Sequence, residues 1–460
     1  MERSIPIPVW LLLLLFLLWG VATVTFGWAV RSKLTGDAQS GYLGDVAVEI
    51  ASFPSLAAEV VLEVIGYSTG DYKDAAVIVS READADYAGF APISAAPGID
   101  VEGPLVKVNP AEALSGWRLV SGAFVVDGDM ENAALLLSPG PEPHIVKRWI
   151  LDEIPVGDFK PQPKHLKFVH GVEMLGDGSL IFTFDGSVSL QRIDSCGDRQ
   201  WTTGGVFHHS VTLDESGETV WTFSDFAVIA QVAVDDGAVL RRISMDDIIA
   251  ANPGTDLLEI RRSHPNDLHV NSRNTEGEWL TDPFHLNDVE PLPSAIADRL
   301  PGFEAGDLLV SVRSLNLLFV LDPNTLRIKW WRTGATQRQH DPDWLPSGEI
   351  LVLNNRMSRD YSEIVAMDPL SLARTVRFDG RKNNFYTRIR GKHQMLDGGY
   401  QVISSPQQGR AFEVDGRGDV VFEIVNPKPG SDNENYVVSE LRWIPTQALD
   451  VENWRCPPAH

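Results

Sequence analysis

The sequence predicts an all-β fold, a six-bladed β-propeller preceded by an N-terminal transmembrane helix and a short helical segment. Three observations support this prediction. A long apolar run stands near the N-terminus, short apolar runs joined by turn residues repeat from about residue 117 onward, and histidines recur at a similar place in several repeats. The predicted organisation is a membrane anchor over residues 1–33, a linker with short helices over 34–115, and the propeller over 116–460, with an insertion at about 246–283.

The anchor is predicted from residues 9–30, which read VWLLLLLFLLWGVATVTFGWAV and contain no charge. A helix of this length spans the roughly 30 Å hydrocarbon core of a bilayer. A cleaved signal peptide usually has a shorter apolar stretch and a small-residue cleavage site, so an uncleaved single-pass anchor is favoured. Arg3 on one side and Arg31 with Lys33 on the other leave the orientation open. Residues 45–65 carry apolar residues at helical spacing and predict one or two short helices.

The propeller is predicted from a recurring phrase of apolar run, turn and apolar run. Examples are LGDGSLIF at 175–182, LPSGEILVL at 345–353 and LDGGYQVI at 396–403. Each phrase is a hairpin whose turn glycine accepts positive φ, and two hairpins make a four-stranded blade. Five clear blades and a degenerate first one over residues 117–149 give six. Residues 437–443 predict a strand that returns to close the ring, which favours a propeller over the rival β-solenoid.

Residues 245–283 interrupt the phrase and form the predicted insertion. Insertions in repeat folds map to loops on one face, often the working face, so this segment is expected to cover or edge a central site.

Composition excludes several classes of function. The net charge of −24 argues against a nucleic-acid partner, which needs a basic surface. No Gly-rich phosphate loop, nucleophile elbow or zinc-protease motif is present, and no cofactor is predicted. The two cysteines, Cys196 and Cys456, are too few for a four-thiolate metal site, and the sequence leaves open whether they pair.

Five of the eleven histidines stand just before the first hairpin of a repeat: His170, His209, His285, His340 and His393. The first strand of each blade lines the central channel of a propeller, so equivalent positions converge on the axis. The gap to the turn glycine is eight residues for His170, His209 and His340 but five or six for His393. A single such histidine is most simply a residue that bonds neighbouring blades, whereas five together predict a functional cluster.

Three chemistries fit a histidine cluster: metal binding, nucleophilic or acid–base catalysis, and binding of an anion. Asp288, Asp341 and Asp343 are the carboxylates available to a metal. Arginines near the histidines, namely Arg313, Arg356, Arg388 and Arg390, suit an oxyanion better than a cation, so no metal is assigned.

At these residues the sequence resembles the bacterial arylsulfotransferase (arylsulfate sulfotransferase) family. The segments that carry the resemblance are FHHSVTLDESGETVW, DPFHLNDVEPLP, QHDPDWLPSGEILVLNNR and KHQMLDGGYQVIS, with the turn IDSCGDRQW, across about residues 168–424. The resemblance implies a six-bladed propeller outside the cytoplasm that moves a sulfuryl group from an aryl sulfate donor to a phenolic or other hydroxyl acceptor, without a nucleotide, through a sulfohistidine.

The resemblance also implies roles for individual residues. His393 is the expected nucleophile, and His340 and Arg356 are expected to bind the sulfate oxygens. His209, with His208 as its close substitute, is expected to assist proton transfer. The additional candidates are His285, Asn287 and Arg313, whereas His170 is left closer to a structural role.

Two alternatives stay open from the sequence: a non-catalytic propeller scaffold or binding module, and a metal-dependent hydrolase or lyase on the same histidine ring. The expected partners are small-molecule donor and acceptor and a membrane reached through the N-terminal helix. Well-studied family members dimerise through a β-rich N-terminal domain that this chain does not resemble, so the oligomeric state is left open. The expected location is a single-pass membrane protein with the propeller on the periplasmic face.

Overall fold

A computed structural model describes residues 8–34, 41–64, 77–81, 87–157, 163–185, 187–258, 282–454 and 456. The chain divides into two compact units, one formed by residues 1–70 and 259–282 and the other by residues 71–258 and 283–460. The first unit contains the two long helices, and the second contains the β-propeller.

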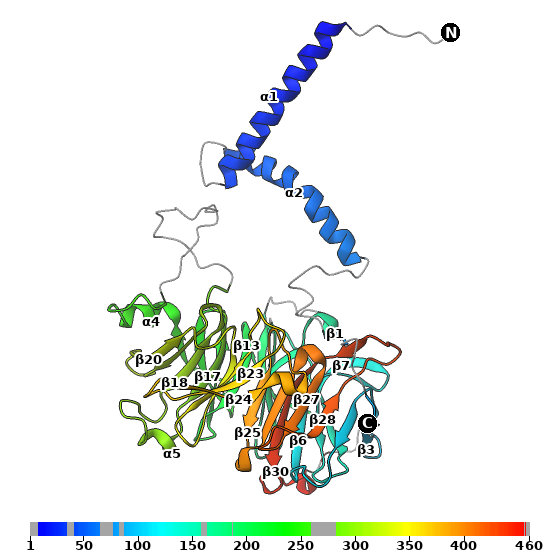
Figure 1. Ribbon diagram of the computed structural model, residues 1–460, viewed down its shortest axis with the longest axis vertical. Coiled ribbons are helices and arrows are strands. Elements are labelled where there is room, and N and C mark those ends of the chain that lie inside the picture. The colour runs from blue at the N-terminus through cyan, green and yellow to red at the C-terminus, as the bar shows by residue number, and fades with distance from the viewer. Residues whose placement is uncertain are drawn as a thin grey trace. The chain divides into compact units, whose positions relative to one another are not determined.

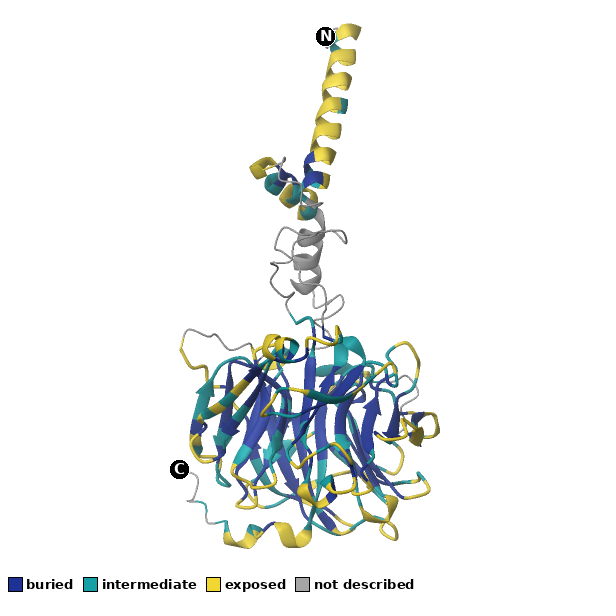
Figure 2. Cartoon of the chain, turned by 90° about the vertical axis from the view of Figure 1, so that its left-hand side faces the viewer, coloured by how far each residue is buried: buried dark blue, intermediate teal, exposed yellow. Residues whose placement is uncertain are grey.

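The first unit contains α1 (Val9–Leu34) and α2 (Gly41–Val64). Residues Val9–Lys33 have a mean hydropathy of 2.4 and none of the most apolar stretch is buried, as Figure 2 shows. The helix is long and apolar enough to cross a membrane, a property that it shares with signal sequences. An ion pair between Lys33 and Asp45 joins α1 to α2. The segment predicted as one or two short helices is part of one helix of 24 residues.

The propeller prediction is confirmed: the second unit contains six blades (Figure 1). Blade I is β6 (Gly116–Val126), β7 (Asp129–Leu137) and β8 (His144–Ile150) with β30 (Val438–Pro445). Blade II is β9 (Val169–Met174), β10 (Leu180–Phe184), β11 (Ser189–Ile193) and β12 (Arg199–Gly204). Blade III is β13 (Phe207–Leu213), β14 (Thr219–Ser224), β15 (Val228–Ala233) and β16 (Val239–Ser244).

The other three blades follow in chain order. Blade IV is β17 (Leu286–Pro291), β18 (Leu308–Val312), β19 (Leu317–Leu321) and β20 (Ile328–Thr333). Blade V is β21 (His340–Trp344), β22 (Ile350–Asn354), β23 (Glu363–Met367) and β24 (Arg374–Asp379). Blade VI is β25 (Lys392–Met395), β26 (Gln401–Ser405), β27 (Arg410–Val414) and β28 (Val420–Val425). Successive strands within each blade are antiparallel hairpin neighbours, as the repeated phrase predicts, whereas β30 reaches β6 from the far end of the chain.

The innermost strands form a closed ring. β9 contacts β13, β13 contacts β17, β17 contacts β21, β21 contacts β25, β25 contacts β30, and β30 contacts β9. Blade I is completed by β30, which pairs with β6 from Val438 to Pro445, so the predicted ring-closing strand is present. The two ends of the propeller are therefore joined by a sheet ladder.

Residues 34–115, predicted as a linker with short helices, also supply strands to the propeller. β5 (Leu105–Val108) and β2 (Ala91–Pro92) extend blade VI beyond β28. β3 (Ser94–Ala95) pairs with β8, and β4 (Val101–Glu102) pairs with β6. A separate ladder joins β1 (Ile78–Ser80) to β29 (Glu434–Tyr436). These strands are two to four residues long, too short to show an alternating pattern in the sequence.

The hydrophobic core lies between neighbouring blades. Leu136 and Trp149 of blade I pack with Phe182 of blade II, and Leu318 of blade IV packs with Val352 of blade V. Figure 2 shows the buried strands as a continuous band across the propeller. Each blade buries its faces only against its neighbours, which is why the repeated unit is stable only in the closed ring.

Short helices complete the described chain. α4 (Met245–Ala251) opens the predicted insertion with a capping box between Ser244 and Asp247, and α5 (Ser294–Ala297) lies between β17 and β18. Residues 259–281 of the insertion lie outside the described residues, so the role expected of the insertion at the site stays a prediction. Short 3-10 helices are η2 (Lys164–Leu166), η3 (Arg313–Leu315), η4 (Gly380–Asn383), η5 (Asp397–Gly399), η6 (Pro406–Gln408), η7 (Thr446–Ala448) and η8 (Val451–Asn453).

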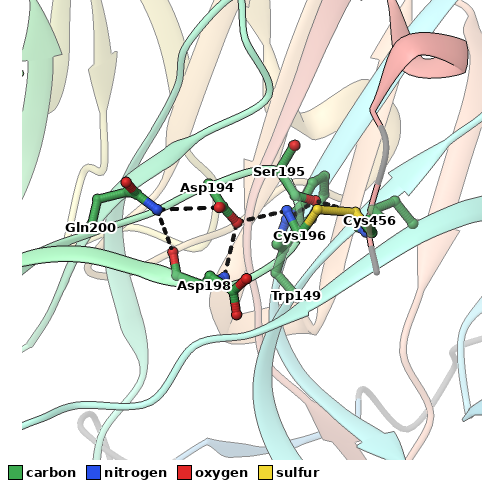
Figure 3. The surroundings of a disulfide bond; sticks show 8 residues. Trp149, Asp194, Ser195, Cys196, Asp198, Gln200 and Cys456 are labelled. Atoms are coloured by element: carbon green, nitrogen blue, oxygen red, sulfur yellow. Dashed lines mark hydrogen bonds between the residues drawn. A yellow bond between two sulfur atoms is a disulfide. The ribbon is translucent and has the colours of Figure 1, made fainter. Parts of the chain in front are cut away.

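Cys196 and Cys456 form a disulfide, with their Cα atoms 5.3 Å apart (Figure 3). Cys196 lies in the turn between β11 and β12, where Asp194 accepts hydrogen bonds from the backbone N–H groups of Cys196 and Asp198. The indole of Trp149 in blade I donates to the carbonyl of Ser195 in the same turn. The disulfide therefore attaches the C-terminal segment to blade II.

Candidate active site on the propeller axis

Five of the six innermost strands contain a β-bulge near the axis. The pairing register shifts at His170 in β9, at His209 in β13, at Asn287 in β17, at Asp341 in β21 and at Ser439 in β30. A bulge leaves its extra residue out of the ladder and re-aims the side chain. The bulges therefore leave one residue of β9, β17 and β30, and two adjacent residues of β13 and β21, outside blade pairing.

These five bulge residues line a water-sized cavity of about 10 Å³ together with Lys392, the first residue of β25. Each blade thus contributes one side chain, and we call the set the axial ring: His170, His209, Asn287, Asp341, Lys392 and Ser439. Of the five histidines predicted to converge on the axis, His170 and His209 belong to this ring. Two of the six ring residues are histidines, and the other four blades contribute Asn287, Asp341, Lys392 and Ser439.

A larger cavity of about 400 Å³ adjoins the axial ring, sharing His170, His209, His340 and Arg390 with the smaller one. Four histidines, four arginines and one carboxylate stand on its wall. The residues are His170, Asp185, His209, His285, Arg313, Arg338, His340, Met357, Arg388, Ile389 and Arg390. We call it the histidine–arginine cavity. Its volume is that of a small-molecule pocket, and its guanidinium groups suit an oxyanion.

The histidines of this cavity contact one another. The ring centroids of His170 and His209 are 4.1 Å apart, and those of His209 and His285 are 5.0 Å apart. Burial lowers the pKa of His170, His209 and His340 well below the usual value. Nearby positive charge lowers the pKa of these rings further, from Arg390 at His170 and from Arg313 at His340. These imidazoles are therefore neutral at neutral pH, each with one lone pair and one N–H.

The hydrogen bonds of His340 define its tautomer. The amide nitrogen of Asn355 donates to the carbonyls of Thr387 and Arg390, so its oxygen faces His340 Nδ1 at 2.7 Å. Nδ1 of His340 therefore carries the proton. Its Nε2 accepts from the backbone N–H of Arg390 at 3.3 Å. Both ring nitrogens of His340 are thus engaged by protein groups.

Four residues of the cavity wall have a strained backbone conformation. His209, His285, Arg338 and Arg390 have φ values of 60°, 51°, 55° and 65°, in the left-handed region that side chains other than glycine seldom adopt. Such conformations cost of the order of 1–3 kcal/mol each and cluster at functional sites. Four of them on the wall of one cavity support a functional role for that wall.

The structure brings many of the predicted site residues together. His209, His285, His340 and Arg313 all line the histidine–arginine cavity. Two more predicted residues lie directly beside this cavity. Asn287 belongs to the axial ring, and His208 is hydrogen-bonded to His209, with their Nδ1 atoms 2.6 Å apart. The six predicted residues that meet here therefore come from blades III, IV and V.

Arg356 and His393 lie elsewhere. The guanidinium of Arg356 donates to Glu363 at 2.9 Å and stacks 4.4 Å above the ring of Tyr361, and its neighbour Met357 lines the cavity instead. His393 follows the axial-ring residue Lys392, and successive side chains of a strand point to opposite sides. The shorter gap between His393 and its turn glycine was the sequence signal of this different register. The roles expected for both residues stay predictions.

His393 belongs to a carboxylate-rich cluster next to the axial ring. Its Nδ1 lies 3.2 Å from Asp343, which raises the pKa of the imidazole although burial opposes this. Lys392 donates to Asp341 at 2.6 Å and lies 3.7 Å from Asp288. Burial raises the pKa of Asp288 to about 7, an effect that Lys392 opposes and that Asp341 and Asp343 reinforce.

The same cluster contains a possible metal-ligand set among the described residues. One donor atom each of Asp341, Asp343 and His393 lie within 4.8 Å of one another. Both oxygens of Asp341 already accept hydrogen bonds, one from Lys392 and one from the backbone N–H of His393, each at 2.6 Å. The ammonium group of Lys392 therefore already supplies, beside Asp341, the positive charge that a metal ion would bring.

Several cavity residues were not assigned roles from the sequence. His170 was left closer to structure, and Arg338 was not proposed; Arg388 and Arg390 were noted among the arginines that suit an oxyanion but were given no individual role. Arg388 and Arg390 are visible in the sequence as the basic residues just before His393. The bulges and positive φ angles that aim these side chains at the axis have no counterpart in the residue pattern.

A family model described as arylsulfotransferase (ASST) matches residues 171–427, which is more than half of the chain. The chain belongs to the arylsulfotransferase family. The match begins in blade II and ends after blade VI, so it includes every residue of the histidine–arginine cavity except His170. The resemblance that the sequence indicated is confirmed. Membership of the arylsulfotransferase family supports a sulfotransferase-type activity for this chain.

The solved structures that are similar to this chain share little of its sequence. No curated protein matches the chain. Among solved structures, a protein of unknown function from Bacteroides caccae is 14% identical, with a TM-score of 0.46, and covers 72% of this chain and 99% of its own. Virginiamycin B lyase from Staphylococcus aureus is 10% identical, with a TM-score of 0.34, over 61% of this chain and 84% of its own.

Proposed function

We propose that the chain transfers a sulfuryl group from an aryl sulfate donor to a phenolic or other hydroxyl acceptor, without a nucleotide, in the histidine–arginine cavity. The observation that carries the proposal is the wall of this cavity, where four arginines and four histidines surround about 400 Å³. Guanidinium groups suit the binding of a sulfate ester and imidazoles suit attack on it, and the cavity lies in a chain of the arylsulfotransferase family.

The arginines have the binding role. During sulfuryl transfer, negative charge spreads over the three oxygens that stay on sulfur, and donors held in place around those oxygens stabilise it. Arg313 lies between β18 and β19 of blade IV, Arg338 lies between blades IV and V, and Arg388 and Arg390 lie between blades V and VI. The four arginines therefore reach the cavity from three separate segments. Each guanidinium presents a planar fork of N–H donors that matches the oxygens of a sulfate group.

A histidine has the covalent role. A neutral imidazole nitrogen attacks sulfur, the S–O bond to the aryl group breaks, and the electron pair leaves with the phenolate. The sulfohistidine then passes its sulfuryl group to the acceptor oxygen, whose proton leaves to a base. Buried histidines with lowered pKa values keep the lone pair that the first step needs.

The test is intact-protein mass spectrometry of the full chain in detergent after a brief reaction with an aryl sulfate. We expect an added mass of about 80 Da, one SO3 group, that disappears when a phenol acceptor is added. The release of phenolate gives an independent optical readout. If several donors give neither phenolate nor adduct, the proposal is wrong.

A second candidate function, a metal-dependent hydrolase or lyase, rests on the group of Asp341, Asp343 and His393. Elemental analysis of the purified full chain separates the two. A stoichiometric transition metal that is lost together with activity on chelation would favour the hydrolase. Retention of activity in a chelator, with no bound metal, would favour sulfuryl transfer.

For the cellular location, we propose a single-pass membrane protein anchored by α1 with the propeller on the periplasmic side. The disulfide between Cys196 and Cys456 supports this, because disulfides persist in oxidising compartments. The test is protease treatment of intact spheroplasts, in which an accessible propeller would be cleaved. Protection until the membrane is opened would place the propeller in the cytoplasm and overturn the proposed orientation.

A further inference from the structure

Asp185, the one carboxylate on the described wall of the histidine–arginine cavity, lies beside a histidine. Nδ1 of His170 is 4.0 Å from Oδ1 of Asp185. Both residues belong to blade II, where His170 is the bulge residue of β9 and Asp185 directly follows β10. In the part of the chain that the structure describes, Nδ1 of His170 is buried and has no hydrogen-bond partner. The ring therefore presents one nitrogen to a carboxylate without being bonded to another group there.

The other cavity histidines have different partners. Both ring nitrogens of His340 are engaged by protein groups, and Nδ1 of His209 is bonded to a neighbouring histidine. Between described residues, a histidine nitrogen lies within 4.0 Å of a carboxylate oxygen twice, at His170 and at His393. His393 is not on the wall of this cavity. Among the described pairs, the histidine–carboxylate pair that faces the cavity is therefore that of His170.

The pair and the arginines enter the cavity from different parts of the ring. The arginines come from segments of blades IV to VI, and blade II lies opposite blade V in the closed ring. The guanidinium carbon of Arg390 is 3.5 Å from the ring centroid of Phe168, whose ring centroid is 5.0 Å from that of His170. A sulfuryl group held by Arg390 therefore adjoins His170, and the blade II side is left for the acceptor that attacks it.

We propose that His170 is the base that takes the proton of the acceptor hydroxyl, and that Asp185 is a positioning residue that stabilises the imidazolium so formed. The inference rests on the proposed sulfuryl transfer and concerns its second half-reaction, in which another histidine carries the sulfuryl group. A carboxylate beside a neutral imidazole holds the ring proton on the nitrogen that faces it, which leaves the other nitrogen as the acceptor. Nε2 of His170 is thus the atom that receives the proton.

The step balances in atoms and electrons. The acceptor oxygen forms a bond to sulfur while its proton moves to Nε2 of His170. The bond between sulfur and the carrier histidine breaks, and its electron pair returns to that ring. His170 then releases the proton to water, where it balances the phenolate that left in the first half-reaction.

The charges around His170 suit a transient protonation. Burial lowers the pKa of its imidazole and Arg390 lowers it further, so the ring is neutral before the acceptor enters. A sulfuryl group paired with Arg390 offsets the largest of the charges that oppose protonation. Asp185 supplies the counter-charge, and its 4.0 Å separation from Nδ1 can shorten once the ring is charged, as catalytic hydrogen bonds do when a complex forms.

The experiment measures the two half-reactions separately, with the full chain in detergent. An aryl sulfate first loads the protein, and loss of the SO3 adduct is then followed by mass spectrometry after phenol is added. Asp185→Asn and His170→Phe should each slow discharge to phenol about 10- to 100-fold more than they slow formation of the adduct. A nitrophenol that is already ionised at pH 8 needs no base, so most of this extra loss should vanish with it as the acceptor.

Controls separate this role from effects on folding. Asp198 is exposed in the same blade and His165 is exposed before it, so Asp198→Asn and His165→Phe should keep the wild-type ratio of discharge to formation. If His170→Phe does not fold, Asp185→Asn still tests the pair, because an amide replaces the carboxylate with nearly the same shape.

The outcomes distinguish the inference from the function on which it rests. A wild-type ratio of discharge to formation in Asp185→Asn and His170→Phe would overturn the inference. An equal loss with phenol and with ionised nitrophenol would also overturn it, because a base acts only on an acceptor that still has its proton. An adduct mapped to His170 would make this residue the carrier and leave sulfuryl transfer standing without the proposed base. Absence of any wild-type adduct and of any phenolate release would overturn sulfuryl transfer itself.

Discussion

Arg118 and Glu413 form a buried two-pronged ion pair between blade I and blade VI. Nε of Arg118 lies 2.6 Å from Oε1 of Glu413, and Nη2 of Arg118 lies 2.8 Å from Oε2. The side chains are 0% and 1% exposed. The guanidinium also stacks 4.3 Å above the ring of Phe422. The pair therefore joins the blade that begins the ring to the blade that precedes its closure.

Removing one partner of this pair should loosen the ring. Glu413→Gln leaves the Arg118 charge without its buried counter-charge, and we expect the free energy of unfolding to fall by about 3–5 kcal/mol. The double variant Arg118→Met with Glu413→Leu replaces the pair by apolar groups and should be less destabilised than Glu413→Gln. Denaturant unfolding of all three proteins checks this, and equal stability of the single and double variants would contradict it.

Gly171 is expected to hold His209 in place. A Cβ atom at Gly171 would lie 2.2 Å from the carbonyl oxygen of His209, so Gly171→Ala must displace the bulge that aims the imidazole. We expect at least a tenfold loss in the rate of sulfation, since small misplacements of groups at a reaction site are costly. Gly176→Ala in the following turn is the matched control, because a Cβ there meets nothing within 4 Å. Wild-type rates in both variants would show that this contact does not position His209.

The rate of sulfation should be insensitive to mild acid. Burial lowers the pKa of His170, His209 and His340 well below 6.5, so these rings keep their lone pairs as pH falls from 8 to 6. An ordinary imidazole would lose about three quarters of its neutral form by pH 6. Single-turnover rates across this range check the prediction. An acidic limb centred near pH 6.5 would show that the attacking histidine is solvated.

Asp288→Asn should stabilise the protein at alkaline pH. The pKa of Asp288 is raised from 3.8 to about 7 in the folded chain, so between these values the folded chain keeps a proton that the unfolded chain has lost. The contribution of Asp288 to the free energy of unfolding therefore falls as pH rises through this window. We expect a gain of about 1–3 kcal/mol for Asp288→Asn at pH 8 and none at pH 3.5. Asp256→Asn, at an exposed position, is the control.

The blades could be predicted because each hairpin carries its own signal. The turn glycine Gly178, for example, has a φ of 82° and stands between two apolar runs, which is what the residue pattern requires. The return of β30 to β6 could be predicted because a four-stranded blade lacked one strand. The pairing of Cys196 with Cys456 could not, because 260 residues separate them and only the closed ring brings them together.

The site could be predicted less completely than the fold. Convergence of His209 and His340 follows from blade repetition alone. The position of His393 does not, because a shift of one residue along β25 places Lys392 at the axis instead. His170 looked like a blade residue for the same reason, since a bulge in β9 is a local backbone event without a sequence signature.

β30 follows all the other described strands in the chain, yet it is the innermost strand of blade I and supplies Ser439 to the axial ring. During synthesis, five blades and three strands of the sixth emerge before the strand that closes them. Until then β6 has an open edge, which invites pairing with other chains. A chain cut short before residue 438 therefore exposes this edge, so a partly made or truncated product has neither a closed propeller nor a complete axial ring.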